Sequence, residues 1–424
     1  MTATRSLLHS FFFGLTAAAT ICVSAASSPA AASVVRGDAS PIKHVFVIVL
    51  ENEAYNTAFG PASKAPYLAR TLTAQGVLLR QYFGTGHLSV DNYIAMISGQ
   101  AATPQTSLDC QVYADFTLTG TTADGQAIGG GCVYPSSIST LPNQLTAKGK
   151  TWRGYMEDMG NDPTRESATC GHPALNSPDL TQSAEGPSAA VPLGDQYATR
   201  HNPFVYFHSI IDSPICTTGV VNLDQLPQDL QSERSTPNFV FITPNLCNDG
   251  HDAPCKNGQP GGLVAANAFL LKWVPLILAS PAYQRDGLLI VTFDETEESG
   301  VQVSPTGAIT YSYTGQTCCS EQPGPNLAPF PQSVALGADT YSFQSFGGDR
   351  TGTVLLSPFL KPGTISNTPF NHYSLLKSLE NIFDTHEYLG YAAQPGLVGF
   401  FDGAHSDISV NRVKRPVRSL PPVH

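Results

Sequence analysis

Three continuous apolar runs stand out along the chain, at residues 45–50, 238–243 and 288–293. A run of five or six residues with hardly a polar position indicates a strand buried on both faces, as in parallel sheets. Apolar residues at helical spacing separate these runs. They predict helices at 65–75, 90–97, 141–148, 263–279 and 373–383, with further strands at 77–83, 151–156 and 351–356. Strands alternating with helices predict an α/β fold with a mainly parallel sheet and helices on both faces.

Two regions break the alternation, at 103–134 and 299–346. Both are rich in Gly, Ser, Thr and Gln, and together they hold Cys110, Cys132, Cys318 and Cys319. We expect them to be loop or hairpin insertions that carry disulfides. The sequence favours one domain at 40–405 with these insertions, followed by a basic, solvated tail at 406–424.

The first 32 residues predict a cleaved signal peptide. Arg5 precedes an apolar run at 11–23, and small residues follow, so cleavage is expected between 25 and 32. Removing Cys22 leaves eight of the nine cysteines, an even number typical of disulfides in an exported protein. We therefore expect a secreted or periplasmic protein, and the short spacings favour the pairs Cys110–Cys132 and Cys247–Cys255.

The composition of the chain argues against several classes of protein and partner. The chain has 424 residues with a formal net charge of −11, and only 13% of its residues are charged. An acidic, sparsely charged surface argues against nucleic acid as a partner. The hydrophobic share of 42% is enough for a large core, which excludes global disorder. After the leader no apolar run reaches 18 residues, because Lys272 and Pro275 interrupt the longest, so no transmembrane anchor is expected.

Polar side chains follow the predicted strands where a sheet of this kind binds ligands. Glu51-Asn52 and Asp294-Glu295 come directly after two apolar runs, and residues 245–252 follow a third. Carboxylates gathered at one sheet edge repel one another unless a cation lies among them. The pattern favours a divalent metal bound by oxygen ligands, although any one of these residues alone is more often a turn former.

Ser89 is the candidate nucleophile. It follows a Gly84-Thr85-Gly86 turn and begins the predicted helix at 90–97, where free N–H groups favour a bound phosphate. A neighbouring metal would lower the pKa of its hydroxyl. On local sequence alone, an N-capping role for Ser89 is the simpler interpretation.

Six segments together resemble the bacterial phosphoesterase family, which includes secreted acid phosphatases and non-haemolytic phospholipases C and lies in the alkaline phosphatase superfamily. They are HVFVIVLENEAY, YLARTLTAQG, GHLSVDNYIAMISG, PNLCNDGHD, LLIVTFDE and FNHYSLLKSLENIF. The resemblance implies an alkaline-phosphatase-like fold and the following roles. Metal ligands would be Glu51, Asn52, Ser89, Asp294 and Glu295; catalytic residues Ser89, Asn92, His251 and His372; substrate-binding residues His87, Asn92 and Asp252.

The implied reaction is hydrolysis of a phosphate monoester through a phosphoserine, with a pocket histidine protonating the leaving oxygen at weakly acidic pH. The family often has prolines where this chain has Leu88 and Asp91, which changes the rigidity and charge of the loop. Cys247 stands where two-metal relatives offer an Asp, which favours one divalent metal ion over two. The substrate would be a phosphorylated small molecule or a lipid headgroup.

Other functions stay open at this point. The same site would suit a phospholipase C-type phosphodiesterase acting on phospholipids. Ser89, Asp294 and His372 appear in the order of a metal-free serine esterase, but the chain has no G-x-S-x-G segment. A non-catalytic binding protein is a further alternative, and a sulfatase is disfavoured because no C-x-P-x-R segment is present.

Overall fold

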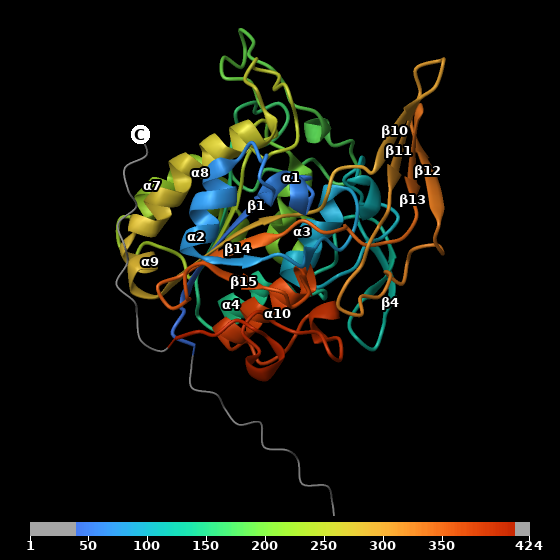
Figure 1. The fold of residues 1–424 in the computed structure, drawn as a ribbon. Helices are drawn as coiled ribbons and strands as arrows, with labels where there is room; N and C mark the ends of the chain where they lie inside the picture. Colours follow the sequence, from blue (N-terminus) through green and yellow to red (C-terminus); the bar gives the residue numbers. More distant parts are fainter. Residues whose placement is uncertain (1–39, 412–424) are drawn as a thin grey trace, which may run out of the picture. The chain divides into compact units, whose positions relative to one another are not determined.

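The computed structural model describes residues 40–411, and an eight-stranded sheet forms its centre (Figure 1). The strand order is β15-β2-β14-β9-β1-β8-β6-β7. Every neighbouring pair is parallel except those of β14, which runs antiparallel to both β2 and β9. The strands are β1 (His44–Leu50), β2 (Val77–Leu79), β6 (Trp152–Met156), β7 (Val220–Asn222), β8 (Phe239–Thr243), β9 (Gly287–Phe293), β14 (Thr353–Leu356) and β15 (Thr364–Ser366). The predicted α/β fold with a mainly parallel sheet is confirmed.

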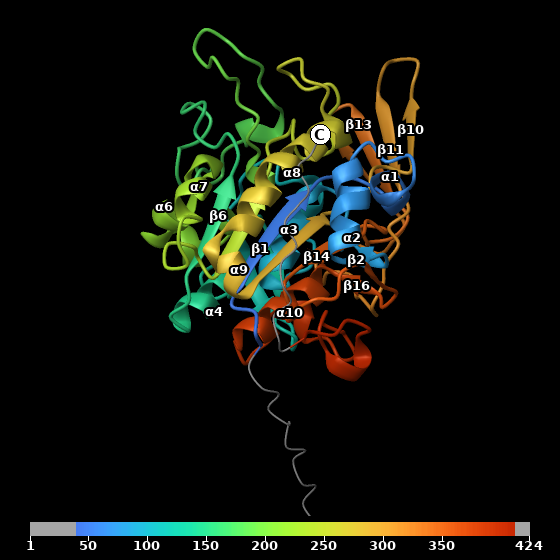
Figure 2. The ribbon, with the colours of Figure 1, turned by 60° about the vertical axis from the view of Figure 1, so that its left-hand side comes forward.

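Helices cover both faces of this sheet because successive side chains of a strand point to opposite sides. Val45, Val47 and Val49 of β1 belong to a core that includes residues of α3 (Ser89–Ser98), α4 (Leu141–Ala147) and α10 (His372–Phe383). Phe46 and Ile48 belong to a second core with α8 (Gly262–Ala279), α9 (Pro281–Asp286) and the helical turn Tyr67–Leu72. Figure 2 shows α8 and α9 along the sheet near β1. Shorter helices are α1 (Tyr55–Phe59), α2 (Thr73–Gln75), α5 (His208–Ile211), α6 (Ile215–Gly219) and α7 (Leu226–Asp229).

Helix α8 matches the predicted core helix. Within residues 40–411 it is the one helix long and apolar enough to cross a membrane by length and composition. Leu270, Trp273, Val274 and Ile277 are buried in the second core. Its apolar character is therefore explained by packing on the sheet.

Two parts of the chain differ from the sequence prediction. The single strand expected at 77–83 is divided into β2 and β3 (Tyr82–Phe83), and β3 pairs with β16 (Phe370–Asn371) in a separate two-stranded sheet. Residues 157–237, for which no element was predicted, contain β7 and several short helices. These elements have only three to five residues, too few to show a period in the sequence.

Two smaller sheets lie in the regions that break the alternation. A hairpin joins β4 (Thr117–Thr121) to β5 (Ala127–Gly130), and a four-stranded sheet has the order β10-β11-β13-β12. Its strands are β10 (Gly300–Val303), β11 (Ile309–Tyr313), β12 (Gln332–Leu336) and β13 (Asp339–Phe343).

The cysteines at 110 and 132 and at 247 and 255 form the two predicted disulfides. Two further disulfides join Cys170 to Cys216 and the adjacent Cys318 and Cys319. The predicted signal peptide and most of the predicted tail lie outside the described residues.

Candidate active site

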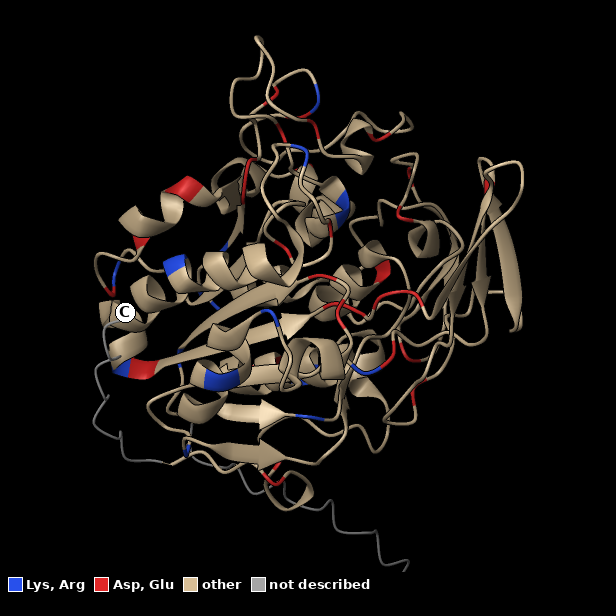
Figure 3. Cartoon of the chain, turned by 45° about the horizontal axis from the view of Figure 1, so that its top comes forward, with Lys and Arg blue, Asp and Glu red and all other residues tan. Residues whose placement is uncertain are grey.

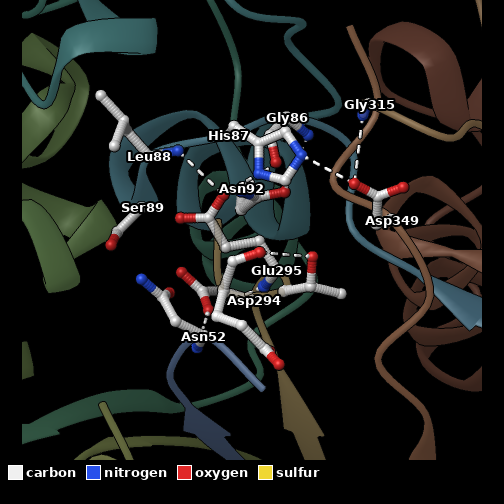
Figure 4. A network of polar contacts seen from close by, with 12 residues as sticks. Asn52, Gly86, His87, Leu88, Ser89, Asn92, Asp294, Glu295, Gly315 and Asp349 are labelled. Carbon is white, nitrogen blue, oxygen red and sulfur yellow. Dashed lines mark hydrogen bonds and ion pairs between the residues drawn. The ribbon is translucent and has the colours of Figure 1, made fainter. Parts of the chain in front are cut away.

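The site lies at the carboxyl ends of β1 and β9, which are neighbouring parallel strands with Leu50 opposite Phe293. This register brings Glu51-Asn52 beside Asp294-Glu295, and Figure 4 shows Asn52 next to Asp294. The side chains of Glu51, Asp294 and Glu295 are almost completely buried. Two pairs of polar residues separated by more than 240 positions therefore meet where the sequence predicted.

Ser89 is the first residue of α3, and its hydroxyl points at the carboxylate cluster. Ser89 Oγ donates a hydrogen bond to Glu51 Oε2 at 2.9 Å, and the Tyr93 hydroxyl donates to the other Glu51 oxygen. The N-cap position belongs to Leu88, which has a positive φ of 72°, and no side chain caps the helix there. The alternative that Ser89 is only an N-cap is therefore wrong.

His201 is a site residue that the sequence prediction missed. Its Nε2 lies 3.2 Å from Ser89 Oγ and 3.2 Å from Glu51 Oε2, and its ring stacks on Tyr93. Burial, together with neighbouring Arg200, lowers the pKa of His201 well below its ordinary value, so the ring is neutral. His201 lies in a single helical turn, Thr199–His201, in the region without predicted elements. No local pattern marks it.

The N-terminus of α3 is partly occupied by a carboxylate of the protein itself. The backbone N–H of Val90 donates to Asp109 Oδ1 at 3.0 Å, and Arg200 Nε lies 3.6 Å from Asp109 Oδ2. The positive charge of Arg200 acts to lower the pKa of both Asp109 and Glu51, against the larger effect of burial. The phosphate expected at this helix end would thus meet an arginine as well as backbone donors.

Glu295 is held from two sides. Its Oε2 accepts the backbone N–H of Leu88 at 2.8 Å and lies 2.9 Å from His87 Nδ1. The other ring nitrogen of His87 lies 3.0 Å from Asp349 Oδ2, and Asp349 also accepts the N–H of Gly315 (Figure 4). Since both ring nitrogens of His87 are engaged, the residue positions Glu295 and the loop before Ser89.

The amide of Asn92 is engaged with the same loop. Its Oδ1 accepts the backbone N–H groups of Thr85 and Gly86 at 2.8 and 3.1 Å, and its Nδ2 donates to Gly86 O at 3.0 Å. The sequence expectation was a bond to a phosphoryl oxygen. In the structure Asn92 instead fastens the loop that precedes Ser89.

The predicted histidines lie in different environments. His372 is fully buried, and its ring nitrogens meet the Tyr82 hydroxyl at 2.9 Å and the backbone carbonyl of Asp294 at 2.5 Å. Burial lowers the pKa of His372 to about 4. These contacts contradict a role for His372 as the pocket acid or as the third member of a Ser89–Asp294 esterase triad, because both nitrogens are already bonded inside the fold.

His251 and Asp252 lie at the exposed rim of the site. His251 Nδ1 is 3.2 Å from Asn52 Nδ2, whereas no hydrogen bond joins the Asp252 side chain to another site residue. The nearby Asp249, which the prediction did not select, is buried and has one carboxylate oxygen with no partner.

The donor set fits a divalent cation. Burial, followed by the charges of Asp294 and Asp249, raises the pKa of Glu51 well above its ordinary value. Asn52 Oδ1, Asp249 Oδ2 and Asp294 Oδ2 are buried without hydrogen-bond partners. Among the residues described, no three His, Cys, Asp or Glu side chains are already close enough together to hold an ion. Unpaired buried oxygens on mutually repelling acids are nevertheless the ligands that hard cations prefer.

Comparisons with known proteins identify the family of this chain. The model of the Phosphoesterase family matches residues 61–386, and the chain belongs to that family. It is 26% identical over 66% of its length to a probable acid phosphatase of Kluyveromyces lactis, covering 54% of that protein. It is 27% identical over 57% of its length to a phosphate-repressible acid phosphatase of Penicillium chrysogenum, covering 46%. The chain thus spans about half the length of these fungal relatives.

A bacterial relative and a solved structure complete the comparison. A phosphatidylinositol-3-phosphatase of Mycobacterium tuberculosis is 27% identical over 62% of this chain and 67% of its own. A structure from Vibrio parahaemolyticus, described as a protein in the alkaline phosphatase superfamily, aligns with a TM-score of 0.45 and 10% identity, covering 81% of this chain and 67% of that one.

Proposed function

We propose that this chain is a metal-dependent phosphoesterase that hydrolyses phosphate monoesters, with Ser89 as the nucleophile and a phosphoserine intermediate. The observation that carries the proposal is the Ser89 hydroxyl at the start of α3, 2.9 Å from Glu51 in a buried carboxylate cluster. Family membership and the acid phosphatases among the relatives support phosphoric esters as substrates. The same resemblance favours monoesters over diesters.

In the first step Ser89 Oγ attacks phosphorus, forming the Oγ–P bond while the bond from phosphorus to the alcohol oxygen breaks. His201 Nε2, which lies 3.2 Å from Ser89 Oγ, is the candidate acceptor of the Ser89 proton, since Glu51 would be engaged with the metal. The departing alcohol oxygen takes a proton, for which exposed His251 at the rim is the candidate donor. Water then hydrolyses the phosphoserine, releasing phosphate and restoring the hydroxyl.

The residues that would hold the metal are Glu51, Asn52, Asp249 and Asp294, with Glu295 behind them. Bound there, a divalent ion would supply positive charge that offsets the phosphate and favours the serine alkoxide. The protein itself keeps these oxygens away from water and close together. His87 holds Glu295 in place, and the pairing of Leu50 with Phe293 brings the two strand ends together.

Arg200 is the proposed phosphate-binding side chain. It is paired with Asp109 next to the first turn of α3, and a planar guanidinium can bind two phosphate oxygens at once. Arg200 Nη1 also donates to the backbone carbonyl of Gln182 at 3.1 Å. We expect Arg200→Gln to raise KM and the inhibition constant for inorganic phosphate about tenfold or more, and a melting curve verifies that the variant folds. Unchanged phosphate inhibition in a folded Arg200→Gln protein would contradict this role.

The test of the function is phosphate release from glycerol 3-phosphate by the full chain, with and without a chelator. Ser89→Ala is expected to lower kcat by about 1000-fold or more, since the nucleophile is lost. Ser98→Ala is the matched control: Ser98 is a buried serine at the other end of α3, bonded to Ile94 O. Phosphatidylcholine and a carboxyl ester, run beside the monoester, test the diesterase and esterase alternatives. Wild-type activity in Ser89→Ala would refute the proposal.

We also propose that the protein works in an oxidising compartment. Four disulfides join all eight cysteines of the described residues, and disulfides persist outside the reducing cytosol. Fractionation of the producing cells, with mass spectrometry of the N-terminus of the exported chain, tests both export and the expected cleavage between 25 and 32.

A further inference from the structure

The four-stranded sheet formed by β10, β11, β13 and β12 has one apolar and one polar face. The registers place Tyr311 opposite both Val301 and Tyr341, and Tyr341 opposite Val334. We call the face that these residues share the aromatic face. It comprises Val301, Val303, Ile309, Tyr311, Tyr313, Val334, Leu336, Tyr341 and Phe343, with the polar Gln332 and Asp339 opposite Phe343 and Leu336. The opposite face carries Gln302, Thr310, Ser312, Ser333, Thr340 and Ser342.

Only the base of the aromatic face is buried. Tyr313 and Phe343 are buried, whereas Tyr311 and Tyr341 are half-buried and Val301 is 48% exposed. The rings form a continuous ladder, with Tyr311 and Tyr341 stacked at 5.1 Å between centroids and Tyr313 and Phe343 at 5.2 Å. A contiguous apolar surface left open to solvent is characteristic of a binding site.

The buried base of the aromatic face packs against the loop that precedes Ser89. The Tyr313 ring lies 4.5 Å from the ring of His87, which holds Glu295. A small cavity is lined by Gly86, His87 and Asp91 on one side and by Val334 and Phe343 on the other. The chain leaving β11 donates the N–H groups of Gly315 and Gln316 to Asp349, the second partner of His87. The sheet therefore starts at the loop that carries the nucleophile.

We propose that the aromatic face binds the alcohol part of the phosphoester substrate and that this part is apolar, an aryl or alkyl group. The proposal rests on the proposed function, because the phosphate must lie at Ser89 for the alcohol to reach the sheet. A single molecule that fits both surfaces carries phosphate at one end and an apolar group at the other.

The charge of the sheet supports this choice. Residues 300–343 contain no Lys or Arg and only two acids, Glu321 and Asp339, and the sheet is almost without charge (Figure 3). An alcohol that bears further phosphates would find no basic partner on this face. Stacked aromatic rings, by contrast, bind aryl and alkyl groups by apolar contact.

The test compares alcohols of similar leaving-group chemistry. The specificity constant kcat/KM is measured for glycerol 3-phosphate, butyl phosphate, octyl phosphate and benzyl phosphate, all below their aggregation limits. We expect the wild type to favour octyl and benzyl phosphate over glycerol 3-phosphate by about tenfold or more, mainly through KM. The octyl and benzyl arms distinguish an alkyl from an aryl preference.

Variants then locate the effect. Tyr311→Ser and Tyr341→Ser are expected to lower kcat/KM for the apolar substrates about 3-fold to 10-fold each while changing it less than about 2-fold for glycerol 3-phosphate. Thr310→Ala and Thr340→Ala, on the opposite face of the same strands, are the matched controls and should leave the preference unchanged. Melting curves verify that each variant folds.

A binding measurement keeps this proposal separate from the proposed function. Octylphosphonate has no hydrolysable ester bond, so its dissociation constant reports binding alone, and Tyr311→Ser should raise it about 3-fold to 10-fold. A wild type that hydrolyses all four esters equally well, or tyrosine variants that weaken every substrate alike, would overturn the aromatic-face proposal alone. If no ester is hydrolysed, the proposed function falls, and equal octylphosphonate affinity in the wild type and Tyr311→Ser overturns the aromatic-face proposal as well.

Discussion

Replacing Asn92 by alanine distinguishes two roles for this residue. Its contacts indicate that it fastens the loop before Ser89, whereas the sequence predicted a hydrogen bond to a phosphoryl oxygen. The amide satisfies three buried backbone groups in the loop before Ser89: the N–H groups of Thr85 and Gly86 and the carbonyl of Gly86. Leaving a buried backbone group without a partner costs roughly 1–3 kcal/mol. Because water can enter the space left by the side chain, we take the low end for each group and expect Asn92→Ala to lose about 3 kcal/mol.

For a chain of this length that loss corresponds to a melting temperature lower by about 3–5 °C, measurable by scanning calorimetry. The specificity constant should fall as well, because the loop positions Ser89. Asn92→Asp keeps an oxygen for the two N–H groups but removes the donor to Gly86 O and buries a carboxylate, so a loss of stability is expected for this variant too. If Asn92→Ala loses activity at an unchanged melting temperature, its main role is a substrate contact and our interpretation of the loop is refuted.

Two further predictions concern stability and backbone packing. Burial raises the pKa of Glu380 from an ordinary value of 4.5 to about 8. The neutral carboxyl therefore favours folding fully below pH 4.5, and this contribution to stability is lost as the pH rises through 8. Glu380→Gln keeps an acceptor for the N–H of Leu389. Its free energy of unfolding should exceed that of the wild type at pH 9 by at most about 5 kcal/mol and differ little at pH 5. Denaturant titrations in which the unfolding free energies of the two proteins depend equally on pH would contradict this prediction. A Cβ at Gly84 would lie 2.5 Å from the backbone oxygen of Asp294, so Gly84→Ala should destabilise the protein by about 1–3 kcal/mol and lower its activity. A Cβ at Gly120 would have no atom within 4 Å, so Gly120→Ala is the control and should change neither stability nor activity. Similar melting curves for the two variants would refute this prediction.

The main sheet was predictable because its strands are long and apolar. The expected runs at 45–50, 238–243 and 288–293 correspond to β1, β8 and β9, and the polar residues after β1 and β9 meet in the structure. Both guessed disulfides also form, because the cysteines of each pair are near in sequence. Local information was sufficient for these features.

The rest of the site depends on contacts between distant segments. His201 and Arg200 lie in one helical turn of a region without regular period. Only the tertiary fold brings His201 to Ser89, more than a hundred positions away, and Arg200 to Asp109. One of the three histidines selected from the family resemblance, His372, is instead bonded to Tyr82 and the Asp294 backbone. A residue type and its position in a motif do not determine which way a buried side chain points.

The most direct test of the central claim is to trap the intermediate. The full chain, incubated with glycerol 3-phosphate and quenched in acid, is digested and analysed by mass spectrometry. The account predicts one added phosphoryl group on the peptide that contains Ser89, localised to that serine and absent from Ser89→Ala. A phosphoryl group on a histidine, or an active enzyme that never carries phosphate on Ser89 under rapid quench, would contradict it.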